Sequence, residues 1–384
     1  MNKLRVLSIF GTRPEAVKMA PVVRALAVAP NVDALVCVTA QHRQMLDQVL
    51  SLFQIIPDID LDLMRPNQSL AELTAAVFTY LDPVLEQLAP DWVLVQGDTT
   101  TVMAASLAAY YRKIRVGHVE AGLRTFDKWQ PFPEEINRRV AGVVADLHFA
   151  PTEWSRQNLL REGIPSEQVL VTGNPVIDAL QSVASLPAPA EICTLLERLE
   201  IPVDRSYGNG RNAPRLILVT AHRRENFGRP IENICTAIAS LAETYQGQVQ
   251  FVYPVHLNPN IQEPVYRLLG KIANVTLLSP LEYLPMVQVM KRSTLVLTDS
   301  GGLQEEAPGL GVPALVLREV TERPEGVEAG TVLLVGTDTE KIVAETRRLL
   351  DNPQAYAVMA HAANPYGDGH AAERIVRGIL DFGF

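Results

Sequence analysis

The sequence predicts an α/β protein made of two doubly wound, Rossmann-like domains that face a cleft. Short β-branched runs alternate with longer amphipathic runs along the chain, and this alternation starts again after a polar, Gly/Asn-rich segment at 202–214. Alternating strands and helices are typical of parallel sheets covered by helices on both faces. The 384 residues, 47% of them apolar, suffice for about two separate cores.

The first domain is predicted from five short apolar runs and the amphipathic runs between them. The expected strands are 5–10, 33–39, 92–96, 115–120 and 147–150, and the expected helices are 17–28, 41–53, 70–88, 101–111 and 134–145. In the second half the expected strands are 215–220, 248–254, 275–278, 294–298, 314–317 and 331–335, with helices between them. Each half therefore has the pattern of a doubly wound sheet.

The domain boundaries are expected at turn-forming segments. We expect an N-terminal domain at 1–172 and a C-terminal domain at 173–369, with a hinge near 172–175. A last helix, within 370–384, follows the turn at 364–369, and we expect it to return to the first domain.

Composition disfavours several classes of protein. The formal net charge is −9 and no basic stripe occurs, which argues against a nucleic-acid-binding surface. No apolar stretch approaches the roughly 18 residues of a membrane span, and no signal peptide is indicated, so we expect a cytoplasmic protein. The cysteines Cys37, Cys193 and Cys235 are scattered and no HExxH spacing occurs, so neither a disulfide framework nor a metal site is expected.

The segment Ser300-Gly301-Gly302 follows a predicted strand and opens a helix. Glycines allow a ligand close to the backbone, and free N–H groups at a helix start attract anions such as a diphosphate. A tight turn with a serine cap explains the same residues equally well. Glu306, one turn further, could accept hydrogen bonds from ribose hydroxyls or lie on a solvated helix face.

The turn after the first predicted strand lacks the GxGxxG pattern of dinucleotide sites, and no Tyr-x-x-x-Lys occurs, so a nicotinamide cofactor is not expected. This turn instead carries Arg13 and Lys18, which could meet phosphate or sugar oxygens or form surface ion pairs. His222 follows the first strand of the second domain. A lone histidine is more often structural, but its strand-end position favours a role in binding.

Acidic residues follow strands and loops of the first domain: Asp98, Glu120, Glu134 and Glu135. Arg138 lies four residues after Glu134, on the same face of a predicted helix. Any one of these acids alone is more often a helix cap or an ion-pair partner. Acids at three successive turns that are expected to face the cleft, with Asp98, Glu120 and Glu134 as the set, exceed what a fold requires and point to acid/base catalysis.

Seven motifs resemble those of the non-hydrolysing UDP-N-acetylglucosamine 2-epimerases of bacteria. They are FGTRPEA (10–16), QGDT (96–99), HVEAGLR (118–124), PEEINR (133–138), TAHRREN (220–226), TDSGGLQEE (298–306) and TERPE (321–325). The resemblance runs from about Leu4 to Gly378. It implies a glycosyltransferase-B-like fold, an active site in the interdomain cleft, no cofactor and a homodimer.

The resemblance also implies substrates and residue roles. UDP-N-acetylglucosamine would epimerise at C2 to UDP-N-acetylmannosamine through elimination and readdition of UDP. The implied catalytic residues are Asp98, Glu120, Glu134 and His222. The implied substrate-binding residues are Arg13, Lys18, Arg138, His222 and Arg323, with Ser300, Gly301 and Gly302 on the diphosphate and Glu306 on the ribose.

Some members of the family bind UDP-N-acetylglucosamine at a second, regulatory site. Gln41, His42 and Gln44 match the start of that site, although a plain helix start explains them too. Asn67 stands where such members carry a basic residue, and Leu281 and Met286 replace more familiar residues beside the uracil.

Three other functions stay open on the sequence. A hydrolysing epimerase would share much of the site. A glycosyltransferase of the same fold would leave the three acids without a task. A catalytically silent sensor of sugar nucleotides would need neither the acids nor all of the cations.

Overall fold

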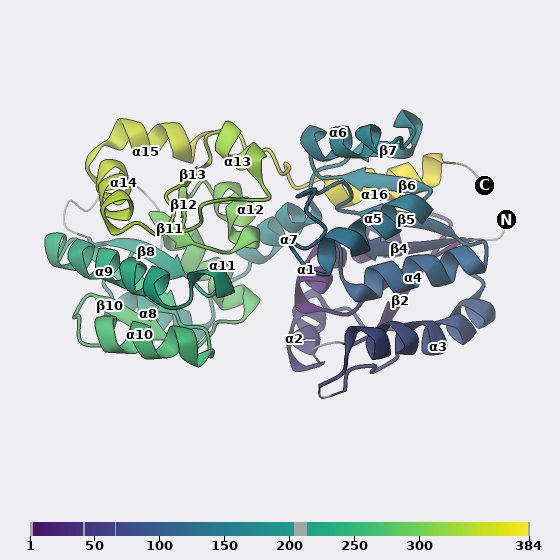
Figure 1. The fold of residues 1–384 in the computed structure, drawn as a ribbon, viewed down its shortest axis with the longest axis horizontal. Coiled ribbons are helices and arrows are strands. Elements are labelled where there is room, and N and C mark those ends of the chain that lie inside the picture. The colour runs from purple at the N-terminus through teal and green to yellow at the C-terminus, as the bar shows by residue number, and fades with distance from the viewer. Residues whose placement is uncertain (1–2, 41–42, 66, 203–212, 383–384) are drawn as a thin grey trace. The chain divides into compact units, whose positions relative to one another are not determined.

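The computed structural model describes residues 3–40, 43–65, 67–202 and 213–382. The chain forms two compact units, Met1–Ala179 with Tyr366–Phe384 (unit 1) and Leu180–Pro365 (unit 2) (Figure 1). Each unit is built on a parallel sheet with helices on its faces, which confirms the predicted fold class. Helix α7 (Pro175–Ala184) carries the chain from the first unit into the second.

Both crossings between the units lie a few residues away from the predicted boundaries at 172/173 and 369/370. The Asn174 N–H donates to the Tyr366 carbonyl over 2.6 Å, and the Ala372 N–H donates to Asp178 Oδ1 over 2.8 Å. These bonds join the start of α7 to the returning chain, and both segments therefore belong to unit 1.

Unit 1 has seven parallel strands in the order β3-β2-β1-β4-β5-β6-β7. The strands are β1 (Leu4–Phe10), β2 (Val32–Val38), β3 (Ile59–Asp60), β4 (Trp92–Gln96), β5 (Arg115–Val119), β6 (Leu147–Ala150) and β7 (Val169–Val171). The helices are α1 (Arg13–Val28), α2 (Arg43–Phe53), α3 (Leu70–Leu88), α4 (Thr100–Tyr111), α5 (Glu134–Val144), α6 (Glu153–Arg161), the short η1 (Ser166–Gln168) and α16 (Ala371–Asp381).

The order of the strands fixes where a ligand site can lie in unit 1. β1 pairs with β2 on one side and with β4 on the other, so the winding reverses between β1 and β4. Ligands of open α/β sheets bind beyond the carboxyl ends of the strands at such a reversal. The turns after β1 and β4, which carry Arg13 and Asp98, therefore lie at the expected place.

The C-terminal helix α16 packs on unit 1. A Cβ built on Gly378 would lie 2.5 Å from Leu170 Cδ1, so only a glycine allows this close approach. The ring of Phe382 meets Trp92 edge to face at 5.5 Å between centroids.

Unit 2 has six parallel strands in the order β10-β9-β8-β11-β12-β13. They are β8 (Arg215–Thr220), β9 (Val249–Pro254), β10 (Val275–Leu278), β11 (Leu295–Thr298), β12 (Ala314–Val316) and β13 (Val332–Leu334). The helices are α8 (Ala190–Arg198), η2 (Arg224–Asn226), α9 (Arg229–Thr244), α10 (Pro259–Leu269), α11 (Tyr283–Arg292), α12 (Gly301–Gly309), α13 (Pro324–Glu328), α14 (Thr339–Asp351) and α15 (Pro353–Ala360).

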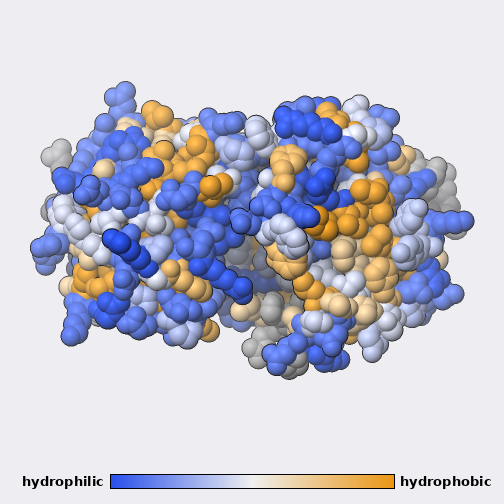
Figure 2. All heavy atoms as spheres, viewed as in Figure 1, coloured by the Kyte–Doolittle hydropathy of each residue, from blue (hydrophilic) through white to orange (hydrophobic). Residues whose placement is uncertain are grey.

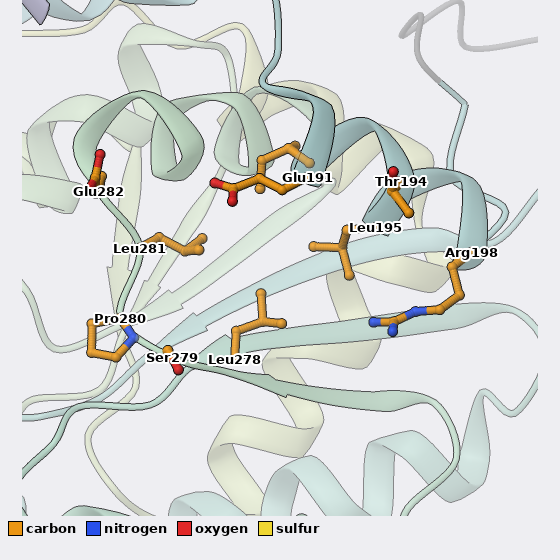
Figure 3. Close-up of a pocket in the computed structure, with 10 residues that line it drawn as sticks. Glu191, Thr194, Leu195, Arg198, Leu278, Ser279, Pro280, Leu281 and Glu282 are labelled. Carbon is orange, nitrogen blue, oxygen red and sulfur yellow. The ribbon is translucent and has the colours of Figure 1, made fainter.

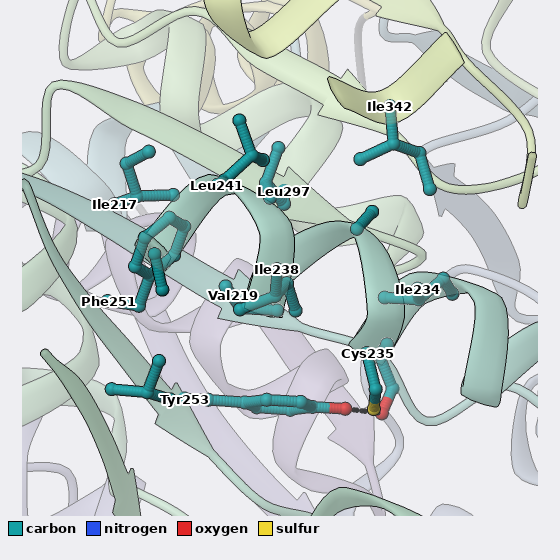
Figure 4. Close-up of a cluster of buried hydrophobic side chains, with 14 of the residues drawn as sticks. Ile217, Val219, Ile234, Cys235, Ile238, Leu241, Phe251, Tyr253, Leu297 and Ile342 are labelled. Atoms are coloured by element: carbon teal, nitrogen blue, oxygen red, sulfur yellow. Dashed lines mark hydrogen bonds between the residues drawn. The ribbon is translucent and has the colours of Figure 1, made fainter. Parts of the chain in front are cut away.

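The core of unit 2 lies between its sheet and helix α9 (Figure 4). Ile217 and Phe251 of the sheet pack against Ile238 and Leu241 of α9, all of them fully buried. The Tyr253 hydroxyl in this layer donates to the Ala221 carbonyl over 2.8 Å. The winding reverses between β8 and β11, so the ends of these two strands mark the expected ligand site of unit 2.

On the face that Figure 2 shows, polar residues predominate and apolar residues gather in patches on both units. Within the described part of the chain, no helix combines the length and the apolar character needed to cross a bilayer.

Candidate active site

The turn after β1 is held by a carboxyl group of its own helix. Glu15 Oε2 accepts from the Gly11 and Thr12 N–H groups at 3.1 and 2.7 Å, and Oε1 accepts from Thr99 Oγ1 at 2.8 Å. Burial raises the pKa of Glu15, and these hydrogen bonds oppose the rise. The carboxylate of Glu15 already occupies the N-terminus of α1, so the helix start is not open to an anionic ligand. The cationic group that this turn carries is the half-buried Arg13.

Glu120, which follows β5, is buried and surrounded by donors. Lys18 Nζ donates to its Oε1 over 2.5 Å, Asn174 Nδ2 donates to the same oxygen over 2.9 Å, and Gln96 Nε2 donates to Oε2. The residue adopts φ +62°, a conformation that is strained for a side chain other than glycine. The ion pair between Lys18 and Glu120 therefore brings two of the predicted site residues together.

Asp98, which follows β4, keeps 29% of its side chain exposed. Arg138 Nη2 donates to its Oδ2 over 2.5 Å, and Asn137 Nδ2 donates to its backbone carbonyl over 3.0 Å. Arg138 is itself buried and also contacts Glu135, with 3.3 Å between Nη1 and Oε2. Asp98 therefore presents a carboxylate to solvent with one oxygen held by a fixed guanidinium.

The neighbouring acids Glu134 and Glu135 have different environments. Glu135 is fully buried and accepts from the N–H groups of Thr125 and Phe126 at 3.1 and 3.2 Å, so it holds the loop before α5. Glu134, the first residue of α5, is half-buried. Of the two, Glu134 is the acid that a substrate can reach.

His118, on β5, binds the backbone of the turn that carries Asp98. Its Nε2 donates to the Gly97 carbonyl over 2.7 Å, and Gly97 has φ +82°. Burial lowers the pKa of His118 to about 4, so the ring is neutral at pH 7. His148 pairs with His118 across the sheet, and burial lowers its pKa to about 3. Both histidines are part of the frame of unit 1.

In unit 2, a buried carboxylate organises the loop after β8. Asp299 Oδ2 accepts from the backbone N–H groups of His222 and Arg223 at 2.7 and 2.8 Å and from Asn226 Nδ2 at 2.9 Å. Its other oxygen lies 3.4 Å from His222 Nδ1. Burial lowers the pKa of His222, and the charge of Asp299 acts against this effect. His222 is thus fixed at the strand end with 39% of its side chain exposed.

The N-terminus of α12 has the features of an anion site. Ser300 is the N-cap, and its side chain makes no capping bond, which leaves the first N–H groups of the helix without a serine cap. A Cβ on Gly301 would lie 2.6 Å from Arg323 Nη1, so the guanidinium packs against the first helical residue. Glu305 holds Arg323 by an ion pair. A fixed cation beside a helix N-terminus favours a bound phosphate.

Glu305 and Glu306 do not form a solvated helix face, so that alternative from the sequence is wrong. Glu305 is 1% and Glu306 8% exposed, and Glu306 Oε1 accepts from the Tyr283 hydroxyl over 3.0 Å. Glu306 is therefore fixed on α12, one turn after the glycines.

A pocket of about 440 Å³ lies between α8 and the end of β10 (Figure 3). Its walls combine apolar side chains with charged groups; they are Glu191, Ile192, Thr194, Leu195, Arg198, Leu278, Ser279, Pro280, Leu281 and Glu282. Because β10 belongs to the same parallel sheet as β8 and β11, this pocket opens at the carboxyl edge that also carries His222 and Ser300.

The predicted site residues thus fall into two groups. Unit 1 carries Arg13, Lys18, Asp98, Glu120, Glu134 and Arg138, and unit 2 carries His222, Ser300, Gly301, Gly302, Glu306 and Arg323. The possible regulatory residues Gln41 and His42 lie outside the described residues, and the same holds for the side chain of Gln44, so their role stays a prediction. No cluster of three or more metal-ligating side chains occurs among the residues that the structure describes.

Sequence reasoning assigned no role to several residues that hold the site. Asn174 and Gln96 bind Glu120, Tyr283 binds Glu306, and Asp299 binds the His222 loop. Gln96 and Asp299 lie inside the motifs QGDT (96–99) and TDSGGLQEE (298–306), whereas Asn174 and Tyr283 lie outside all seven motifs.

Known proteins resemble the chain over its whole length. A family model described as UDP-N-acetylglucosamine 2-epimerase matches residues 24–380. UDP-N-acetylglucosamine 2-epimerase of Salmonella typhimurium (strain LT2) is 54% identical over 379 residues, which cover 99% of each chain. The enzyme of that name from Neisseria meningitidis serogroup A is 52% identical over 378 residues, 98% of this chain and 99% of the relative.

Solved structures agree with this likeness. The crystal structure of UDP-GlcNAc 2-epimerase from Neisseria meningitidis bound to UDP-GlcNAc has a TM-score of 0.87 at 52% identity and covers 98% of this chain and 100% of its own. The S. aureus MnaA–UDP structure has a TM-score of 0.87 at 46% identity, with 98% of this chain and 96% of its own covered.

We predict that His118 makes the fold sensitive to mild acid. The folded state binds the His118 proton only near pH 4, whereas the unfolded chain binds it below about pH 6.5. The free energy of unfolding should therefore fall as the pH drops from 6.5 to 4, by up to about 1.4 kcal/mol per pH unit from this residue. Urea unfolding of His118→Gln should show a shallower loss. The exposed control His370→Gln should keep the wild-type slope, and an unchanged slope in His118→Gln would contradict the assignment.

Proposed function

Because the chain belongs to the UDP-N-acetylglucosamine 2-epimerase family, we propose that it interconverts UDP-N-acetylglucosamine and UDP-N-acetylmannosamine without net hydrolysis. The observation that carries this proposal is a set of three acids in unit 1. Asp98 forms an ion pair with Arg138, Glu120 forms an ion pair with Lys18, and Glu134 is half-buried and accessible. A transferase or a sensor would not need three acids held in this way.

The chemistry requires the nucleotide to leave first. The proton on C2 of the sugar is not next to a carbonyl, so a base cannot simply remove it. When the C1–O bond breaks, its electron pair leaves with UDP, and positive charge at C1 makes the C2 proton acidic. A carboxylate takes that proton, the C2–H electrons form the C1–C2 double bond, and the products are 2-acetamidoglucal and UDP. Addition of UDP, with protonation of C2 from the opposite face, gives the epimer.

The environments of the acids support different tasks for them. Asp98 and Glu134 both reach solvent, so both can exchange a proton with a substrate. Glu120 is buried with donors on both oxygens, so we assign to it the stabilisation of positive charge and the positioning of Lys18. Arg13 adds a further cation at the end of β1.

Unit 2 supplies the groups that would hold UDP. The diphosphate would bind the N–H groups at Ser300, Gly301 and Gly302 beside the Arg323 guanidinium, as the N-terminus of α12 favours. His222 would donate to the departing phosphate oxygens, and Glu306 would accept from the ribose hydroxyls. Such groups stabilise the charge that develops on the leaving diphosphate and keep UDP bound for readdition. A cytoplasmic homodimer remains a prediction from the resemblance.

Incubation with UDP-N-acetylglucosamine in D₂O, followed by proton NMR, tests the proposed reaction. We expect UDP-N-acetylmannosamine with deuterium at C2 and little free UDP at equilibrium, because the proton removed from C2 exchanges with solvent. UDP released in stoichiometric amounts would instead identify a hydrolysing epimerase. Absence of turnover without an added acceptor would identify a transferase or a sensor.

Asp98→Asn should abolish turnover while UDP binding stays close to wild type. The amide keeps the shape of the side chain but cannot take a proton, and removal of a general acid or base costs on the order of 10²- to 10⁴-fold in rate. Kinetics and calorimetric titration with UDP measure the two effects separately. Asp381→Asn, at an exposed position of α16, is the control. Loss of UDP binding in a folded Asp98→Asn protein would show that the role is misassigned.

Gly301→Ala should weaken UDP binding by about tenfold, equal to about 1.4 kcal/mol. The new methyl group would displace the Arg323 guanidinium, whose Nη1 lies 2.6 Å from the position of that Cβ. Titration of UDP into Gly301→Ala, Arg323→Ala and the double variant measures this directly. Because both changes remove the same contact, the double variant should bind little worse than Arg323→Ala alone. Full additivity of the two losses would contradict the explanation.

A further inference from the structure

Asn174 connects the start of α7 with the acid Glu120, and neither the seven motifs nor the proposed reaction gives it a role. The residue is 1% exposed and lies between β7 and α7. Its side-chain Nδ2 donates to Glu120 Oε1 over 2.9 Å, and Lys18 Nζ donates to the same oxygen over 2.5 Å. Asn174 therefore directly contacts the ion pair between two of the predicted site residues.

The backbone of Asn174 is fixed by the returning C-terminal segment. Its N–H donates to the Tyr366 carbonyl over 2.6 Å, and its carbonyl accepts from the Ile177 N–H over 3.0 Å. The preceding Gly173 has φ +86°, and a Cβ on it would lie 3.3 Å from the Cα of Gly367. A side chain at that position would press the two segments apart. The close packing of these segments thus holds Asn174 in one place.

The two ends of the Asn174 amide have different tasks. Oδ1 accepts from the Val176 N–H over 3.2 Å at the start of α7, and Nδ2 donates to Glu120. Because a backbone N–H needs an acceptor and a carboxylate needs a donor, this network fixes which end of the amide is the nitrogen. An aspartate would keep the acceptor at the helix start, where it caps as well as asparagine, but it would remove the donor. The amide is therefore required for Glu120 rather than for the helix.

Glu120 depends on this donor because it is a buried carboxyl group at a strained backbone position. It is 6% exposed and has φ +62°, so its surroundings must hold it in place. Gln96 holds Oε2, whereas Lys18 and Asn174 share Oε1. A lysine ammonium sits on a flexible four-carbon stem, so it cannot fix its partner by itself. Asn174 is thus the rigid donor on this oxygen.

We propose that Asn174 is a positioning residue: its amide fixes the Glu120 carboxylate, and through it the Lys18 ammonium, in the orientation that the reaction requires. The inference rests on the proposed function, which assigns to Glu120 the stabilisation of positive charge and the positioning of Lys18. Asn174 acts through Glu120 and not by touching the substrate. Since the Lys18 side chain is 13% exposed, a small displacement of Glu120 changes how its ammonium meets a ligand.

Asn174→Asp tests the proposal because it keeps the shape of the side chain and the acceptor for α7. The new carboxylate would face Glu120, and two like charges raise the pKa of one carboxyl group. At about pH 8 both are ionised and repel each other, so kcat should fall by about tenfold or more, since a misplaced group can cost on the order of 10²-fold. At about pH 6 the pair can share one proton that bridges the two oxygens, so the loss should be smaller. The other titratable groups near Glu120 are Lys18 and His118, and the His118 ring stays neutral over this range.

Asp178→Asn is the matched control, because it is the reverse exchange one turn further along α7. Asp178 accepts from the N–H groups of Ala371 and Ala372 at 3.2 and 2.8 Å, at the start of α16. Loss of its charge should lower the melting temperature but leave kcat and the pH dependence of kcat close to wild type. A purely structural role of Asn174 predicts the same kinetic profile for both variants.

The Lys18 ammonium gives a readout that needs no substrate. The chain has seven lysines, so the proton–nitrogen NMR spectrum of a ¹⁵N-lysine sample is simple. It reports ammonium groups held in buried ion pairs, because exposed groups exchange their protons quickly with water. Lys18→Gln assigns the Lys18 signal. The signal should shift or disappear in Asn174→Asp and Asn174→Ala, and it should stay unchanged in Asp178→Asn.

Two outcomes would overturn the proposal. An unchanged Lys18 signal in both Asn174 variants would show that the amide does not hold the ion pair. A pH dependence of kcat that is the same in Asn174→Asp and Asp178→Asn would show that Asn174 has no specific effect on Glu120. Because the Lys18 signal is measured without substrate, it stands even if the D₂O experiment refutes the epimerase reaction.

Discussion

Buried carboxyl groups hold the loops on which the whole candidate site depends. Glu15 holds the turn after β1, Glu120 binds Lys18 and Asn174, and Asp299 holds the loop after β8. A carboxyl group costs several kcal/mol to bury unless donors satisfy it, so each of these acids requires its surroundings to keep one arrangement. Free backbone N–H groups at strand ends and helix starts supply many of these donors. In a parallel sheet these N–H groups lie at the carboxyl edge, and the buried acids fix the loops at that edge by binding them.

This frame separates acids that support the site from acids that can react. Glu134 and Glu135 are neighbours in sequence, yet Glu135 is fully buried on backbone donors and Glu134 is accessible. Asp98 is accessible as well, with one oxygen held by Arg138. The same separation exists in unit 2, where Asp299 is buried and supports the loop while His222 is partly exposed. Reactive groups on such fixed loops lose little entropy when a substrate binds, which is an advantage for catalysis.

The sequence predicts most of the fold because the strands β1, β4, β8 and β11 are apolar runs long enough to be recognised as strands. It does not predict β3 and β7, because no apolar run longer than three residues surrounds either strand, whereas the three-residue strands β12 and β13 lie within longer apolar runs. The resemblance supplied the site residues, but not their environments. Whether Glu306 lies on a solvated face, for example, depends on Tyr283, which is distant in sequence. The hydrogen bond from Asn174 to Glu120 depends on strand order, which no local pattern records.

The central claim is that the C1–O bond to UDP breaks and then forms again. Positional isotope exchange tests it most directly. UDP-N-acetylglucosamine with ¹⁸O in the bridge between C1 and the β-phosphorus is incubated with the protein, and ³¹P NMR follows the position of the label. Bond cleavage makes the β-phosphate oxygens equivalent, so the account predicts that ¹⁸O moves into non-bridging positions as the epimer forms. Epimerisation with ¹⁸O retained entirely in the bridge would contradict it.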